Sequence, residues 1–169
     1  MTMEKIPMTQ AGFDRLEAEL RTLKSVDRPA VIKAISEARE HGDLSENAEY
    51  HSAREKQSFI EGRILHLEAS ISRADVIDIG KFKGSPTIRF GATISLYDEE
   101  IDEELKYQIV GVDEADLKHG RLSLSAPISR ALMGKKVGDT VEVHTPKGKR
   151  TYDVVAVDYP ERAERFEVN

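Results

Sequence analysis

The sequence predicts an α+β protein in which a helical hairpin precedes a small domain built on an antiparallel sheet. Apolar residues recur every three or four positions as far as about Ala74, the spacing of one helix face. From Val76 onward they occur in short runs separated by glycine and proline, as strands do. Only a short connection after Gly42 joins the two helical patterns, which predicts antiparallel neighbours.

The first helical segment runs from Thr9 to about Gly42. Thr9 is a reasonable N-cap, although the residue three positions on is Gly12 and no reciprocal Glu or Gln completes a capping box. Pro29 interrupts the segment, because proline cannot donate the helical hydrogen bond. We expect one bent helix, with two separate helices as the alternative. The apolar face comprises Phe13, Leu16, Leu20 and Leu23, then Val31, Ile35 and Ala38.

The second helical segment carries a coiled-coil seam, with steps that alternate between four and three residues. Its members are Ala53, Gln57, Ile60, Ile64, Leu67, Ile71 and Ala74. This seam should pack against the first segment. We expect the hairpin to occupy residues 1–78.

The rest of the chain, residues 79–159, should form the sheet domain, with one short helix at Ile128–Met133. Residues 160–169 form a charged tail. The expected strands are Val76–Ile79, Thr87–Leu96, Lys106–Val112, Leu122–Leu124, Thr140–Val143 and Tyr152–Val157.

Composition limits the possible functions. The chain of 169 residues has no cysteine, which excludes disulfides, thiolate metal sites and thiol nucleophiles. No run of about 20 apolar residues is present, so we expect a cytoplasmic protein without a membrane span. A formal net charge of −6 argues against broad binding to phosphate backbones.

Two acidic residues, Asp43 and Glu46, lie between the helical segments. They have the spacing of a capping box for the second helix, and both acids favour the positive end of that helix. Alternatively, they are exposed carboxylates at the tip of a hairpin. Two carboxylates alone make a poor magnesium site, because Mg²⁺ takes six oxygen ligands, so the remaining ligands would belong to another protein. The spacing alone does not decide between these interpretations.

The segment His41–Tyr50, HGDLSENAEY, resembles the hairpin tip of the Gre transcript cleavage factors. The resemblance extends from Ile6 to about Tyr159. Later motifs agree in order: IVGVDEAD at 109–116, APISRALMGK at 126–135 and VGD at 137–139.

The resemblance implies a factor that inserts its coiled coil into the secondary channel of bacterial RNA polymerase. There the tip acids Asp43 and Glu46 would stimulate the polymerase's own cleavage of the 3′ end of backtracked nascent RNA. They would bind Mg²⁺ only in complex with polymerase, at its active centre, and the factor would not be an enzyme by itself. Arg39 and Arg54 would contact the RNA near its 3′ end, whereas the residues alone favour ordinary ion pairs with Glu40, Glu49 or Glu55. We expect no membrane partner and a monomer.

The resemblance further implies an FKBP-like fold for residues 79–159, which would dock on the rim of the secondary channel. Asp113, Asp116, Ser125, Pro127 and Ile128 are the predicted contacts. Ala126 departs from the serine of many relatives, which weakens any hydroxyl contact there. Three alternatives remain: a channel-blocking inhibitor of the same fold, a prolyl isomerase or chaperone, and a coiled-coil interaction module without chemistry.

Overall fold

A computed structural model describes residues 4–42 and 46–160 of the chain. The chain forms two compact units. Phe13–Ala74 makes up the helical unit. Lys5–Gly12 joins the chain from Asp75 onward in the second unit, which contains the five-stranded sheet. Within the described residues, no helix is long and apolar enough to cross a membrane.

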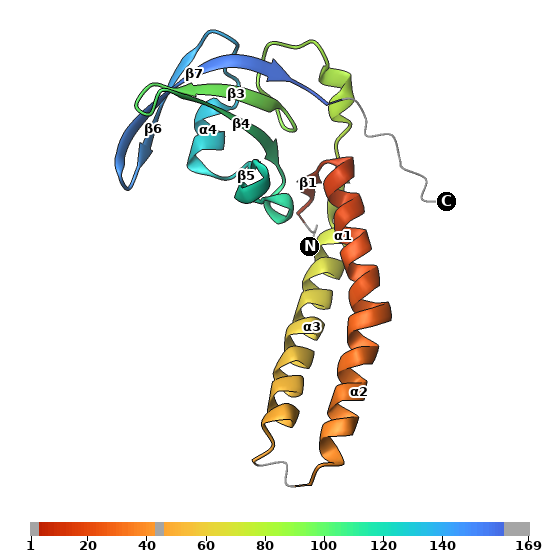
Figure 1. The fold of residues 1–169 in the computed structure, drawn as a ribbon. Coiled ribbons are helices and arrows are strands. Elements are labelled where there is room, and N and C mark those ends of the chain that lie inside the picture. Colours follow the sequence, from red (N-terminus) through yellow and green to blue (C-terminus); the bar gives the residue numbers. More distant parts are fainter. Residues whose placement is uncertain (1–3, 43–45, 161–169) are drawn as a thin grey trace. The chain divides into compact units, whose positions relative to one another are not determined.

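The first arm of the hairpin is one continuous helical run, as the sequence predicts. It consists of α1 (Gln10–Thr22), a π-helical turn η1 (Leu23–Asp27) and α2 (Arg28–Arg39) (Figure 1). The N–H of Arg28 donates to the carbonyl of Leu23, five residues back. Pro29 has no N–H to donate, so a wider turn just before it accommodates the missing bond. The extra residue in this turn keeps Leu23 and Val31 on the same buried face, although they are eight positions apart.

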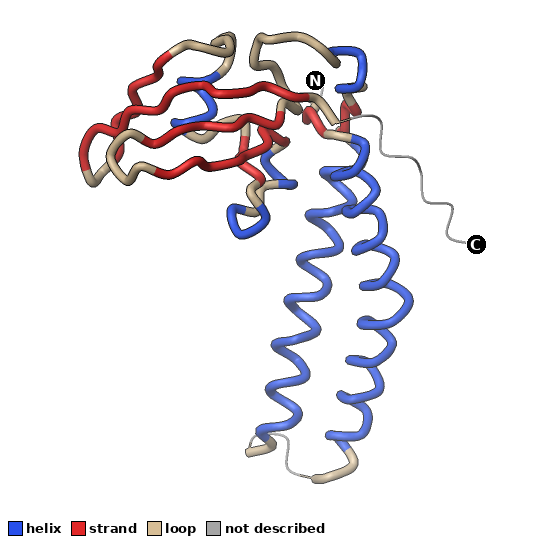
Figure 2. Tube along the Cα trace, turned by 45° about the horizontal axis from the view of Figure 1, so that its top comes forward, coloured by secondary structure: helices blue, strands red, loops and turns tan. Residues whose placement is uncertain are grey.

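The second arm is α3 (Ala48–Ser72), which runs antiparallel to α2 (Figure 2). The predicted seam is confirmed at its centre, where four apolar side chains of α3 are buried: Ala53, Ile60, Ile64 and Leu67. Gln57 and Ile71 are half-buried, and Ala74 belongs to the next strand. A single apolar seam between two helices therefore supplies the core of this unit.

Charged pairs flank the seam. Arg63 contacts the carboxylate of Glu19 with both Nε and Nη2, at 2.8–3.2 Å. Arg28 forms a similar two-point contact with Glu61, at 2.8 and 2.9 Å. These hydrogen bonds raise the pKa of Arg28 and lower that of Glu61. Because the side chains stay substantially exposed, each pair fixes the register of the helices more than it stabilises them.

The start of α1 is held by a carboxylate from far along the chain. Thr9 caps the helix as predicted, since its Oγ1 accepts from Gly12 N at 3.0 Å. The missing capping-box acid is Glu114, which accepts from Thr9 N at 3.1 Å, from Gly111 N at 2.7 Å, and from the Thr9 hydroxyl. A Cβ atom at residue 12 would overlap this carboxylate, so a larger residue there would force Glu114 out of these hydrogen bonds.

Two short strands complete this region. β1 (Ile6–Met8), which the sequence analysis did not predict, pairs with β2 (Ala74–Val76). The predicted strand Val76–Ile79 is therefore displaced toward the N-terminus, and a 3₁₀ turn, η2 (Ile79–Phe82), follows it. Pairing with a segment some 70 residues away decides where β2 lies.

The main sheet has five strands in the order β5-β4-β3-β7-β6. They are β3 (Thr93–Asp98), β4 (Glu103–Val110), β5 (Arg121–Ser123), β6 (Thr140–Thr145) and β7 (Gly148–Asp158). The prediction of an antiparallel sheet was wrong at one pairing, because β5 lies parallel to β4. Two 3₁₀ turns, η3 (Val112–Glu114) and η4 (Leu117–His119), connect these two strands. The connection runs back along β4, so that β5 starts in the same direction.

The predicted strand from Thr87 begins only at Thr93. A turn precedes it, in which Gly91 has a φ of 87° and a Cβ would overlap Ile79. The short helix α4 (Pro127–Leu132) packs against β6, close to the predicted position. Its Leu132 joins a continuous core under the sheet with Ile88, Ala92, Ile94, Leu96, Ile109, Val141, Val143, Tyr152, Val154 and Tyr159.

Candidate functional site

The tip of the hairpin is the place where α2 ends and α3 begins. α2 ends at Arg39, and Gly42 adopts a φ of 100° as the chain turns. The chain is described again at Glu46, two residues before α3. Glu46 is exposed, and Asp43 lies outside the described residues.

The N-cap of α3 is Asn47, so the predicted capping box of Asp43 and Glu46 is wrong. Asn47 has extended backbone angles, and its side-chain Oδ1 accepts from Tyr50 N at 3.0 Å. Asparagine and aspartate are comparable N-caps, and the later of the two starts the helix here. Glu46 consequently precedes the cap, and its carboxylate is not the reciprocal partner at the third helical position.

The two arginines predicted to contact RNA flank this tip. Arg39, the last residue of α2, lies over the ring of Tyr50, with Cζ 5.9 Å from the ring centroid. Arg54 is exposed on α3, one turn beyond Tyr50 and on the same side of the helix. Between described residues, neither guanidinium forms an ion pair with Glu40, Glu49 or Glu55. Both guanidiniums lie beside the tip, and their contact with RNA stays a prediction.

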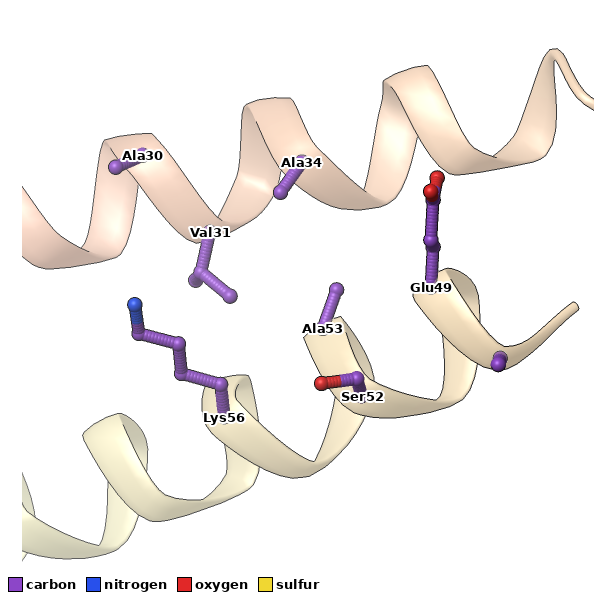
Figure 3. Close-up of a pocket in the computed structure, with 8 residues that line it drawn as sticks. Ala30, Val31, Ala34, Glu49, Ser52, Ala53 and Lys56 are labelled. Atoms are coloured by element: carbon purple, nitrogen blue, oxygen red, sulfur yellow. The ribbon is translucent and has the colours of Figure 1, made fainter.

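A shallow groove of about 450 Å³ lies between α2 and α3 near the tip. Figure 3 shows Ala30 and Ala34 of α2 facing the groove together with Ser52 and Ala53 of α3. Lys56 extends its amine toward α2. Small side chains therefore make much of the contact between the helices in this part of the hairpin.

The predicted docking residues gather at the β5 edge of the sheet. Asp113 lies in η3, which packs on β5. Asp116 pairs in the sheet with Arg121, and its carboxylate accepts from His119 at 2.6 Å. The His119 hydrogen bond lowers the pKa of Asp116, and the charge of Arg121 acts in the same direction.

The remaining predicted contacts follow β5 directly. Ser125 is exposed, and its hydroxyl lies 2.8 Å from that of Ser123, the last residue of β5. Pro127 is exposed and opens α4, where the missing N–H of proline costs nothing, and Ile128 is half-buried beside it. Asp113 and Asp116 thus lie in the turns beside β5, and the other three predicted residues follow that strand within five positions of the chain.

Sequence reasoning missed one residue at the tip and two in the turns before β5. Asn47 was not singled out, although asparagine before an Ala-Glu pair is a recognised helix start. Val112 and Leu117 are 49% and 68% exposed in the turns that carry Asp113 and Asp116. The sequence signal for both was a large apolar residue within a short, otherwise polar turn.

Metal binding was predicted only for the complex with polymerase. Within residues 4–42 and 46–160, no three histidine or acidic side chains come together as a metal site. Glu46 offers one exposed carboxylate, which suits an ion whose other ligands come from elsewhere.

Comparison with known proteins gives matches along almost the whole chain. Residues 6–76 match the family described as "Transcription elongation factor, N-terminal". Residues 83–159 match "Transcription elongation factor, GreA/GreB, C-term". The chain belongs to the GreA/GreB family of transcription elongation factors. The predicted Gre resemblance is confirmed.

Relatives in this family include proteins named "Transcription elongation factor GreA". The protein from Rhodospirillum rubrum is 66% identical over 157 residues, covering 93% of this chain and 99% of the relative. The proteins from Paracoccus denitrificans and Caulobacter sp. K31 are 61% and 57% identical over the same coverage.

Solved structures also match. GreA factor homolog 1 (Gfh1) of Thermus thermophilus is 31% identical with a TM-score of 0.42, covering 91% of this chain and 99% of the other. A GreA/GreB factor from Nitrosomonas europaea is 25% identical with a TM-score of 0.40, covering 92% and 100%.

Proposed function

We propose that this transcription elongation factor binds bacterial RNA polymerase, inserts its helical hairpin into the secondary channel and stimulates cleavage of the 3′ end of backtracked RNA. The observation that carries the proposal is the position of Glu46. It is exposed where the hairpin turns, and the cap of α3 is supplied by Asn47 instead. The carboxylate therefore stays available to a partner.

Asp43 and Glu46 would act together in the polymerase active centre. Both supply hard oxygen ligands, so they would complete the coordination of a Mg²⁺ ion held mainly by polymerase. Such an ion, when bound, stabilises negative charge and favours deprotonation of an attacking water. The part of this chain is to present the two carboxylates and to orient the water through hydrogen bonds.

Arg39 and Arg54 would contact the extruded RNA beside the tip. A guanidinium can bind phosphate in two-point contacts and can stack on a base. Tyr50 lies beside them, with the Arg39 guanidinium over its ring. The net charge of −6 makes a local contact of this kind more favourable than binding along a backbone.

The β5 edge would dock on the rim of the channel through Asp113, Asp116, Ser125, Pro127 and Ile128, in an FKBP-like domain. The exposed Val112 and Leu117 add apolar area to this surface. A docking surface with an apolar centre and a polar rim is typical of protein interfaces. The cytoplasm, where transcription takes place, is the compartment that follows from this proposal.

The deciding experiment measures cleavage of labelled RNA in stalled elongation complexes with purified factor. The Asp43→Asn, Glu46→Gln double variant should lower the stimulated rate by about 100-fold or more, because both catalytic carboxylates are lost. Glu55→Gln, an exposed acid about two turns into α3, is the matched control and should behave like the unmodified factor. Equal cleavage by the double variant and the control would refute the mechanism.

The same assay separates the alternatives. A channel-blocking inhibitor would slow RNA synthesis without producing cleavage, and an interaction module would bind polymerase with neither effect. Prolyl isomerase activity would need an open aromatic pocket. In this structure the Tyr159 hydroxyl already donates to the Thr87 carbonyl at 2.6 Å and accepts from Arg89 N at 2.8 Å, so this aromatic serves the fold.

A further inference from the structure

One side chain, Asn47, joins the ends of the two helices at the tip. Its Nδ2 donates to the carbonyl of Ala38, in the last turn of α2, at 2.7 Å. Its Oδ1 accepts from Tyr50 N, in the first turn of α3, at 3.0 Å. The amide therefore satisfies an exposed end of each helix and links them directly.

The surroundings give this link mechanical importance. The groove beside it is lined in part by Ala30, Ala34, Ala48 and Ala53 (Figure 3). On the same stretch of α2, Val31, Ile35 and Ala38 are buried. The Arg28–Glu61 pair holds the helices together farther from the tip. Close to the tip, the Asn47 amide adds a directional hydrogen bond to this narrow apolar seam.

Glu46 is the residue immediately before this link. The backbone of Asn47 is held on one side by the cap to Tyr50 and on the other by the bond to Ala38. Any movement of α3 relative to the end of α2 would therefore carry Glu46 with it. A carboxylate that must meet a metal ion tolerates little displacement, since an error of about 1 Å can cost 100-fold in rate.

We propose that Asn47 is a positioning residue for transcript cleavage: its bond to the Ala38 carbonyl sets where the Glu46 carboxylate lies. This inference rests on the proposed function. Asn47 itself need not touch RNA, metal or water. Its two hydrogen bonds can be separated by substitution, which makes the role testable.

Two substitutions keep the cap and remove the link. Asn47→Asp retains an oxygen for the Tyr50 N–H but loses the donor, and it places a carboxylate against the Ala38 carbonyl. Asn47→Ser also retains a capping oxygen, lacks the amide donor and adds no charge. Agreement between these variants excludes an effect of charge alone. Glu61→Gln, which breaks a cross-helix pair away from the tip, controls for general loosening of the hairpin.

Single-turnover cleavage is measured against factor concentration, and the helical signal is recorded by circular dichroism at the assay temperature. Both Asn47 variants should lower the maximal cleavage rate by about 10- to 100-fold. The half-saturating concentration should not change, since the docking edge is intact. Glu61→Gln should match the unmodified factor in both quantities.

The inference is overturned if both variants reach the normal maximal rate, if only the half-saturating concentration changes, or if Glu61→Gln loses as much rate. Loss of the helical signal in both variants would likewise assign Asn47 to folding instead of positioning. Failure of the unmodified factor to stimulate cleavage would instead refute the proposed function, and the inference with it. The two failures are therefore distinguishable.

Discussion

The helical unit and the sheet unit are stabilised in different ways. In the hairpin, one seam between two helices is buried, and large apolar side chains such as Phe59 and Leu65 remain 72% and 68% exposed. In the sheet unit, side chains from four strands and α4 converge on a closed core. The stability of the hairpin therefore depends on the alignment of its two helices along one seam. The stability of the sheet unit depends on packing between segments that are far apart in the sequence. This difference suits the roles proposed above, in which the hairpin presents its tip and the sheet unit docks.

The largest expected effect tests the core of the sheet unit. Leu96 is fully buried on β3, the central strand, so Leu96→Ala should lower the free energy of unfolding by about 2–5 kcal/mol. Val155→Ala on β7, where the side chain is 46% exposed, is the control and should change stability by less than about 0.5 kcal/mol. Urea denaturation measures both. Equal effects would show that the sheet is not held by its core.

A second test uses pH on the same unit. Burial alone would raise the pKa of Asp98, but hydrogen bonds from Arg150 and from the backbone of Glu100 and Ile101 outweigh it and lower that pKa. Because the folded state binds the proton more weakly than the unfolded state, this pair stabilises the fold above about pH 4, and the contribution is lost as pH falls further.

Asp98→Asn should therefore lower Tm at pH 7, and the difference from the unmodified chain should shrink below about pH 4. Asp75→Asn, at an exposed position, is the control and should leave Tm unchanged at each pH. A Tm difference for Asp98→Asn that stays constant from pH 7 to pH 3 would contradict a lowered pKa of Asp98 in the folded state.

The smallest expected effect concerns the hairpin. Arg63→Gln removes the two-point contact with Glu19, but both side chains are more than 30% exposed, so the loss should be no more than about 1 kcal/mol. The effect should diminish further in 1 M salt, because exposed charges are screened. Lys33→Gln, which removes only a 3.9 Å contact within α2, should have no measurable effect. A large, salt-independent loss at Arg63 would show that the hairpin is not held mainly by its seam.

Regular local patterns were predictable from sequence, and non-local partners were not. The three- and four-residue spacing placed Ile60, Ile64 and Leu67 on the buried face of α3 because helix geometry alone determines that face. The capping partner of Thr9 is Glu114, 105 residues away, and no local pattern could reveal it. The parallel placement of β5 also escaped prediction, since it depends on the path of two short 3₁₀ turns.

At the candidate site, residue types were predictable and local geometry was not. The acidic tip and the flanking arginines follow from the sequence motif, and the five residues predicted to dock lie just before and just after β5. The helix start was misplaced because Asp43 and Asn47 are both good N-caps, and the bond from Tyr50 N to the Asn47 side chain shows that Asn47 caps α3.

The overlap between a Cβ at position 12 and the Glu114 carboxylate has a consequence for natural variation. The two positions are coupled, because a larger residue at 12 requires the carboxylate at 114 to leave its hydrogen bonds, to be shortened or to be lost. Relatives that carry alanine or serine at the first position should therefore differ at the second as well. Such paired exchange would be detectable by comparing sequences alone.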